Sequence, residues 1–368
     1  MFNLSISSII AFLAILAVPF FSATIMFGWF VSKNKFPVDG RTVLITGASQ
    51  GLGLSAAKQL SSKGANIIIV SRDKKKLQLA ITEITSSAKS PSQKFLHLSY
   101  DLTKEASATK ILAEAVKWNN GQPPDIVWNI AGMSHPAFFA DAPISTLHSQ
   151  MDTVYWSCAY MAHATLNLWK QPVSSSIKLS DMPARHLIFT SSVVALFPIA
   201  GYSPYTPAKA AMRGLADSLA QEVEVYNGSR HPSSPHHASA PVADMKIHII
   251  YPMGISSPGF EQENTIKPEL TLQLEKDDVP QDPDTVAKTC IEALERGEYM
   301  ITTLFLGHLI KGAAFGASVR STILDYFWQF LGGIVILFVT PDFMAKCRNW
   351  GRERGAEATG KKAQAKGV

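Results

Sequence analysis

Short apolar runs alternate with amphipathic stretches from Arg41 to about Thr303. The first run, residues 42–45, is β-branched and aliphatic, as expected of a buried strand. Similar runs predict further strands at residues 66–70, 94–100, 125–129, 186–190, 245–251 and 299–303. Helical patterns lie between them, notably at residues 145–170, 205–226 and 283–296. This alternation predicts an α/β domain over residues 40–303, with a parallel sheet of about seven strands covered by helices on both faces.

One stretch inside this domain breaks the pattern. Residues 227–244 are rich in Ser, His, Pro and Ala and have no apolar periodicity, which predicts a flexible surface insertion. Its His231, His236 and His237 have no Cys or carboxylate partner at a regular spacing, so no metal site is predicted. Its Asn227-Gly-Ser sequon would not be glycosylated in a cytosolic domain.

The N-terminal segment carries no charge from Leu4 to Val31. A spanning helix needs about 20 apolar residues, so residues 1–32 are predicted to form a transmembrane anchor. A cleaved signal peptide would begin with a basic region, and none is present. Lys33, Lys35 and Arg41 follow the apolar stretch, and the positive-inside rule then places the domain in the cytosol.

The C-terminal region, residues 304–340, is apolar again. Its charge-free part, residues 326–340, would measure about 22 Å as a helix, which is short of a hydrocarbon core of about 30 Å. A spanning hairpin, a re-entrant segment and an interfacial helix all remain compatible with this length. Because the domain and the basic tail at residues 341–368 are both expected in the cytosol, this membrane-associated region crosses twice or not at all.

The distribution of charge and of cysteine residues argues against several classes of function. From Lys346 onward the sequence contains seven basic and two acidic residues. The difference, +5, equals the formal net charge of the whole chain. The remainder is near neutral, so nucleic-acid binding has little support. Cys158, Cys290 and Cys347 are scattered, which favours neither a disulfide framework nor a zinc site and fits a reducing compartment.

A glycine-rich turn follows the first strand. Gly47, Gly51 and Gly53 precede a helical pattern, so the backbone can approach a pyrophosphate and the helix N-terminus can bind it. Residues 47–51 also match the G-x-S-x-G elbow of serine hydrolases, with Ser49 as the nucleophile. The position of the turn favours the nucleotide site, because the hydrolase elbow usually follows several strands.

A second constellation is Tyr205-Thr-Pro-Ala-Lys209. A spacing of four places Tyr205 and Lys209 on one helix face, and Pro207 requires that the helix begins there. A nearby ammonium group lowers the pKa of a phenol, which would make Tyr205 a proton donor near neutral pH. Ser191 and Ser192 directly follow the fifth predicted strand. They therefore lie at the carboxyl end of the strand, where ligands of open α/β sheets bind.

Four motifs together resemble the short-chain dehydrogenase/reductase family over roughly residues 40–303. They are Thr46-Gly-x-x-x-Gly-x-Gly53, Asn129-Ile-Ala-Gly132, Ser192 and Tyr205-x-x-x-Lys209. The resemblance implies a Rossmann-type doubly wound sheet of order 3-2-1-4-5-6-7 and a catalytic set of Ser192, Tyr205 and Lys209, with Ser191 as the less favoured serine. In the family, Tyr donates a proton to a carbonyl, Ser binds that oxygen, and Lys tunes Tyr and holds the nicotinamide ribose. Members often form homodimers.

The cofactor is predicted to be NADPH. The second strand is followed by Arg72 and Lys76, which can pair with a 2′-phosphate, whereas an NAD site usually has an acidic residue there. Asp73 is expected to cap the next helix. Val154 occupies the position at which many family members carry an Asn of a proton relay. The predicted cofactor-binding residues are Gly47, Ser49, Gln50, Gly51, Gly53, Arg72, Lys76, Asp101, Leu102, Asn129, Tyr205, Lys209, Ile255 and Ser257.

A more specific resemblance lies in a later loop. Ser257-Pro-Gly-Phe followed by Glu261 and Lys267-Pro268 resembles the corresponding loop of 3-ketodihydrosphingosine reductases. The resemblance implies NADPH-dependent reduction of a long-chain sphingoid ketone in sphingolipid biosynthesis, at the cytosolic face of the endoplasmic reticulum membrane. A membrane-bound reductase of a steroid, retinoid or acyl ketone and a non-catalytic NADP-binding scaffold remain alternatives. Intact Ser192, Tyr205 and Lys209 argue against the scaffold.

Overall fold

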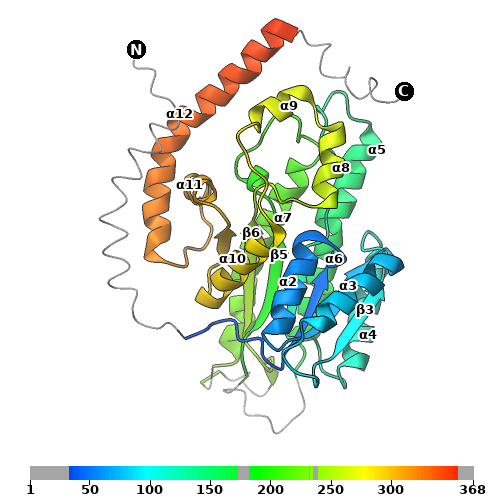
Figure 1. Cartoon of the computed structure of the whole chain (residues 1–368). Helices are drawn as coiled ribbons and strands as arrows, with labels where there is room; N and C mark the ends of the chain where they lie inside the picture. Colours follow the sequence, from blue (N-terminus) through cyan, green and yellow to red (C-terminus); the bar gives the residue numbers. More distant parts are fainter. Residues whose placement is uncertain (1–32, 173–181, 232, 235–238, 355–368) are drawn as a thin grey trace.

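A parallel sheet of seven strands forms the centre of the part of the chain that the structure describes (Figure 1). This computed structural model describes residues 33–172, 182–231, 233–234 and 239–354. The strands are β1 Thr42–Thr46, β2 Asn66–Ser71, β3 Phe95–Ser99, β4 Ile126–Asn129, β5 Arg185–Thr190, β6 Met245–Tyr251 and β7 Met300–Thr302. Their order, β3-β2-β1-β4-β5-β6-β7, confirms the order that the family resemblance implied. The expected anchor at residues 1–32 and the tail beyond residue 354 lie outside the described residues.

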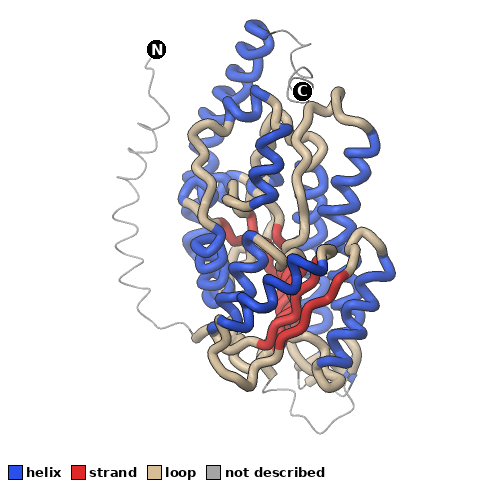
Figure 2. Tube along the Cα trace, turned by 45° about the vertical axis from the view of Figure 1, so that its right-hand side comes forward, coloured by secondary structure: helices blue, strands red, loops and turns tan. Residues whose placement is uncertain are grey.

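Helices cover both faces of the sheet (Figure 2). Successive residues of a strand point to opposite faces, so Val43 and Ile45 pack with one core cluster and Leu44 with the other. The first cluster includes residues of α2 Gly51–Ser62, α3 Lys74–Ser86 and α10 Pro283–Arg296. The second includes residues of α4 Glu105–Trp118, α6 Ser157–Trp169 and α7 Thr206–Ser229. Because both faces of the sheet are buried, most residues of the strands are apolar, and the strands appear in the sequence as continuous apolar runs.

The long helix expected at residues 145–170 is divided into three segments. A short helix α5, Ile144–Gln150, leads into a π-helical turn η1, Met151–Trp156, and then into α6. π-Helical turns leave the regular backbone hydrogen-bond pattern and often lie at functional sites. Val154, which sequence placed at the relay position, lies inside this turn and is fully buried in the core.

The insertion expected at residues 227–244 is more ordered at its ends than its composition suggested. Helix α7 continues to Ser229, and Ala240, Val242 and Ala243 are buried. Arg230 donates to the carbonyl oxygen of Pro241 at 2.9 Å and pairs with Asp244. Composition could not reveal these contacts, because they join the Arg230 side chain to residues at the other end of the loop. His236 and His237 lie outside the described residues.

The C-terminal region forms two packed helices, α11 Phe305–Ala313 and α12 Ile323–Arg354. Helix α12 continues past residue 340, through Pro341 and into the basic segment, for 32 residues in all. Within the described residues, the stretch Ile323–Gly351 of α12 alone is long and apolar enough to cross a membrane, and 28% of its most apolar window is buried. Figure 1 shows α12 running past α11 toward the end of the molecule that carries α8 Pro258–Ile266 and α9 Glu269–Leu274.

Candidate active site

The turn between β1 and α2 packs tightly against the loop that follows β4. Gly47 has a φ of +72°, and a Cβ atom there would lie 2.7 Å from Ala131 Cα. A Cβ atom on Gly53 would lie 2.4 Å from the carbonyl oxygen of Gly47. No other residue fits these two positions, and the close packing aims the N-terminus of α2 at the carboxyl ends of the strands. A pyrophosphate can be bound at such a terminus.

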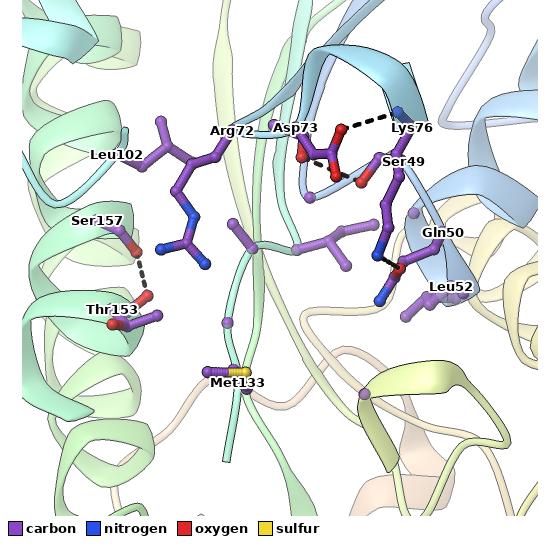
Figure 3. A pocket seen from close by; sticks show the side chains of 18 of the residues that line it. Ser49, Gln50, Leu52, Arg72, Asp73, Lys76, Leu102, Met133, Thr153 and Ser157 are labelled. Carbon is purple, nitrogen blue, oxygen red and sulfur yellow. Dashed lines mark hydrogen bonds between the residues drawn. The ribbon is translucent and has the colours of Figure 1, made fainter. Parts of the chain in front are cut away.

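A cavity of about 460 Å³ opens at this turn (Figure 3). Most of the predicted cofactor-binding residues line it: Gly47, Ser49, Gln50, Gly51, Gly53, Arg72, Lys76, Asp101, Leu102, Ile255 and Ser257. Ser49 is part of the cavity wall, and its Oγ donates to Ser71 Oγ at 3.1 Å rather than to a histidine, as the hydrolase alternative would require. The residues present therefore fit a dinucleotide.

Three predicted cofactor residues lie elsewhere. Tyr205 and Lys209 line the neighbouring cavity. Asn129 is the last residue of β4 and is 2% exposed, and neither atom of its side-chain amide has a hydrogen-bond partner among the described residues. Asn129 therefore lies beneath the cavity floor rather than on its lining.

The rim of the first cavity carries the predicted cations. Arg72 follows β2 and extends into the cavity, and Lys76 Nζ donates to Gln50 Oε1 at 3.1 Å (Figure 3). The Asp73 carboxylate accepts from the backbone N–H groups of Lys75 and Lys76, which confirms that Asp73 caps α3. The acidic side chain is thus occupied by the helix terminus, and Arg72 remains directed at the ligand space.

Sequence reasoning missed part of the opposite wall. Thr153 of η1, Ser157 of α6 and Met133 line the same cavity, and Ser157 Oγ donates to the Thr153 carbonyl oxygen at 2.7 Å (Figure 3). The sequence did not identify these residues, because its apolar pattern predicts a regular helix there. The π-helical turn determines which side chains of this segment face the cavity. The Gly132 of the Asn129-Ile-Ala-Gly132 motif also lines it.

The three predicted catalytic residues lie together on a second cavity. Tyr205 immediately precedes α7, and Lys209 lies one turn later, with Pro207 in the first turn as expected. Lys209 Nζ donates to the Thr190 carbonyl oxygen at 2.7 Å and lies 5.5 Å from the centroid of the Tyr205 ring. Ser191 Oγ donates to the Lys209 carbonyl oxygen at 3.0 Å, so this hydroxyl supports α7. Ser192 Oγ accepts from the backbone N–H of Val194 at 3.4 Å and lines the second cavity, where its hydroxyl can donate to a ligand.

The electrostatics of Tyr205 differ from the expectation. Burial raises the pKa of the phenol, and the Glu263 carboxylate raises it further. Burial also lowers the pKa of the Lys209 ammonium group to about 8. The predicted lowering by Lys209 was wrong for this geometry, because the ammonium is directed at the Thr190 carbonyl and burial determines the direction of the shift at Tyr205. Tyr205 is therefore protonated at neutral pH.

The second cavity measures about 720 Å³ and has two kinds of wall. Near Tyr205, a charged network includes Lys267, whose Nζ lies 2.8 Å from Glu275 and 3.2 Å from Glu263. Tyr202 OH donates to Glu263 at 2.5 Å. The other wall is apolar and comes from α11 and α12. A ligand with a polar reacting end and an apolar tail matches this division.

Within residues 33–354, apart from the short gaps, no three His, Cys, Asp or Glu side chains are grouped so as to hold a metal ion. His231 instead lies 2.7 Å from the Ser233 hydroxyl.

Comparison with known proteins agrees with this site. The family model described as short chain dehydrogenase matches residues 41–227. A 3-ketodihydrosphingosine reductase of Aspergillus fumigatus is 49% identical, over 92% of each chain. A 3-ketodihydrosphingosine reductase of Neurospora crassa is 44% identical, over 89% of this chain and 87% of its own.

Solved structures support the same fold. A short-chain dehydrogenase/reductase from Burkholderia phymatum in complex with NAD has a TM-score of 0.58 at 16% identity, over 73% of this chain and 90% of its own. Levodione reductase has a TM-score of 0.57 at 18% identity, over 72% of this chain and 96% of its own. The chain belongs to the short-chain dehydrogenase/reductase family.

Proposed function

We propose that the protein reduces the 3-keto group of 3-ketodihydrosphingosine to a hydroxyl with NADPH, which yields sphinganine for sphingolipid biosynthesis. The observation that carries this proposal is a single cavity that joins Ser192, Tyr205 and Lys209 to an apolar wall. Relatives up to 49% identical bear the name of this activity. A long-chain ketone needs a proton donor at its carbonyl and an apolar surface for its chain, and the cavity offers both.

Tyr205, Ser192 and Lys209 each have a separate role in the proposed reduction. A dinucleotide held in the first cavity would supply the hydride for the carbonyl carbon. Tyr205 gives its phenolic proton to the carbonyl oxygen, so the C=O double bond becomes a C–O single bond that carries a hydroxyl. The raised pKa of Tyr205 keeps the donor form populated at neutral pH. Ser192 would donate a hydrogen bond to the same oxygen, and Lys209, fixed by the Thr190 carbonyl, would hold the nicotinamide ribose.

The polar wall suits the head of the substrate. The substrate carries an amine next to its ketone, and the carboxylates of Glu263, Glu275 and Asp278 line the same cavity as Tyr205. Burial and the neighbouring Glu275 raise the pKa of Asp278 to about 6. An ammonium group that approaches these carboxylates gains charge-assisted hydrogen bonds.

The cofactor preference rests on Arg72. Its guanidinium lies in the first cavity beyond the end of β2, where the 2′-position of a bound adenine ribose is recognised in this fold. Lys76 adds a second positive charge on the same rim. A 2′-phosphate would pair with both, which favours NADPH over NADH.

We further propose that the protein lies at the endoplasmic reticulum membrane, with its catalytic domain in the cytosol. Helix α12 exposes large apolar side chains along its outer face, among them Phe330 (71% exposed) and Leu337 (69% exposed). Asp325 in its first turn pairs with Lys311 of α11, and Arg354 at its end pairs with Glu269 of the domain. A helix held at its start by α11 and at its end by the domain fits a position on the cytosolic membrane surface better than an independent span.

The activity assay is direct. NADPH oxidation by the full-length protein in detergent would be followed with 3-ketodihydrosphingosine, a ketosteroid and retinal. We expect turnover of the sphingoid ketone only, and its loss in Tyr205→Phe but not in the control Tyr226→Phe on the same helix. Turnover of only the steroid or retinal would replace the substrate assignment. No turnover of any ketone would favour a non-catalytic NADP-binding scaffold.

A further inference from the structure

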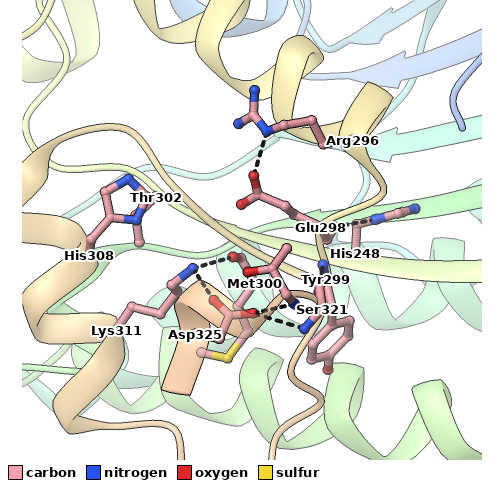
Figure 4. Close-up of polar contacts among 11 residues, drawn as sticks. His248, Arg296, Glu298, Tyr299, Met300, Thr302, His308, Lys311, Ser321 and Asp325 are labelled. Atoms are coloured by element: carbon pink, nitrogen blue, oxygen red, sulfur yellow. Dashed lines mark hydrogen bonds and ion pairs between the residues drawn. The ribbon is translucent and has the colours of Figure 1, made fainter. Parts of the chain in front are cut away.

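The inner face of α12 is packed onto α11 at its start. Lys311 Nζ lies 2.9 Å from Asp325 Oδ1, and the two side chains are 2% and 7% exposed (Figure 4). Where the helices cross, Cβ atoms on Gly312 and Gly332 would lie about 2 Å from backbone of the opposite helix, at 1.9 Å from Trp328 O and 2.2 Å from Leu309 O. Such contact without intervening side chains holds α12 in one position against α11.

The same face of α12 then continues as the wall of the substrate cavity. Val335, Val339 and Phe343 follow one another at helical spacing, and all three line the cavity that contains Tyr205. The Phe343 ring packs edge-on against Phe197 with centroids 5.0 Å apart, and Phe197 belongs to the segment that follows Ser192. The helix is therefore tied to the catalytic side of the cavity as well as to α11.

The opposite face of α12 takes no part in this wall. Leu337 and Phe338 are 69% and 57% exposed, and neither lines the cavity. Two faces of one apolar helix thus have separate surroundings, which sequence hydropathy alone cannot distinguish. Substitutions on the inner face can therefore be compared with control substitutions at neighbouring positions on the outer face.

We infer that the inner stripe of α12, centred on Val339 and Phe343, sets the length of the substrate chain that the enzyme accepts. The inference rests on the proposed reduction of a long-chain ketone at Tyr205. With the carbonyl held at Ser192 and Tyr205, the chain extends along the apolar wall, and the side chains of this stripe determine the room for its distal carbons. Helix α12 is then a specificity element of the active site in addition to a membrane-associated segment.

The test compares kcat/KM over a series of 3-ketosphingoid bases of increasing chain length, with full-length protein in detergent. Val339→Phe should lower kcat/KM for the longest substrates at least tenfold relative to the shortest, since a pocket discriminates about 10- to 200-fold for one misfitting methylene group. Phe343→Ala should move the optimum toward longer chains. The control Leu337→Phe, on the outer face, should leave the profile unchanged.

The outcomes separate the inference from the proposed function. If the unmodified protein reduces no member of the series, the proposed function fails. If it reduces them but Val339→Phe and Phe343→Ala keep its chain-length profile, α12 does not set the length. Thermal unfolding of each variant identifies any that does not fold. Should Val339→Phe unfold, Val339→Ala, which cannot overfill the cavity, must favour longer chains for the inference to stand.

Discussion

Lys209 Nζ lies 5.5 Å from the centroid of the Tyr205 ring and donates to the Thr190 carbonyl oxygen at 2.7 Å. The lysine is thus fixed by β5 beneath the tyrosine rather than directed at its hydroxyl. Because burial lowers the pKa of Lys209 to about 8, its ammonium form is present below that pH and is lost as the pH rises through it. The positive charge of the site therefore depends on pH in an accessible range.

This arrangement predicts a pH profile for ketone reduction. The rate at saturating NADPH should fall as the pH rises through about 8, because neutral Lys209 no longer supports the ribose and the developing charge at Tyr205. Lys209→Arg should move this fall to higher pH, since a guanidinium stays protonated, with a lower maximal rate from its altered geometry. Initial rates of both proteins between pH 6 and 10 would give the midpoint of this fall. An unchanged midpoint in Lys209→Arg would assign the titration to another group.

Arg72 should determine the preference for NADPH. Hydrogen bonds to charged groups contribute about 1.5 to 3 kcal/mol, so Arg72→Ala should raise the KM for NADPH roughly 10- to 100-fold. The KM for NADH should change little. Steady-state kinetics with both cofactors would measure the ratio, with Lys74→Ala as a control from the same helix start outside the cavity. Equal effects of Arg72→Ala on the two cofactors would contradict a 2′-phosphate contact.

The buried pair of Lys311 and Asp325 should be important for the attachment of α12. Asp325 also accepts from the backbone N–H groups of Ser321 and Thr322, so it organises the first turn of the helix (Figure 4). Asp325→Asn would leave the Lys311 charge buried without its counter-ion, and we expect a loss of about 3 to 5 kcal/mol in unfolding free energy. Chemical unfolding in detergent measures this loss.

A double variant provides the control for that prediction. Lys311→Met with Asp325→Asn removes the uncompensated charge and should recover part of the stability lost in Asp325→Asn alone. The exposed pair of Lys346 and Asp342 on the same helix offers a second comparison, because Asp342→Asn there should have an effect below about 1 kcal/mol. Equal losses at the two pairs would show that burial of Lys311 does not matter.

A buried histidine pair predicts acid sensitivity. His248 Nδ1 lies 2.7 Å from the Glu298 carbonyl oxygen and must donate to it, so its Nε2 accepts from His186 Nδ1 at 2.9 Å. Burial lowers the pKa of His248 to about 4. The unfolded chain binds a proton near pH 6.5 and the folded one does not, so stability is present above that pH and is lost as the pH falls toward 4.

The expected size of this loss is roughly 3 kcal/mol for His248, from the difference between the two pKa values. Thermal unfolding between pH 4 and 8 would measure it. His248→Gln keeps a donor for the Glu298 carbonyl but does not titrate, so its melting temperature should depend less on pH. The same pH dependence in His248→Gln would assign the effect to other groups.

Local sequence patterns predicted several geometric features of the two cavities. The turn at Gly47, the cap at Asp73 and the one-turn spacing of Tyr205 and Lys209 depend on residues close together in the chain, and these features are confirmed. The effect of Lys209 on Tyr205 could not be predicted, because the pKa values depend on burial by distant elements. The π turn that presents Thr153 also has no signal in apolar periodicity.

The substrate side was less predictable for a related reason. Helix α12 is apolar on both faces, so its composition indicates a membrane but does not identify the face that packs on α11. Gly332 and Val335 acquire their roles only through contacts with a helix that lies earlier in the chain. The membrane anchor at residues 1–32 and the homodimer stay predictions.

Transfer of labelled hydride tests the central claim most directly. NADPH with deuterium at both C4 positions of the nicotinamide would be incubated with the protein and 3-ketodihydrosphingosine, and the product analysed by mass spectrometry. We expect sphinganine with one deuterium at C3, and none with Tyr205→Phe. A product without deuterium, or no sphinganine from well-folded protein, would contradict the assignment.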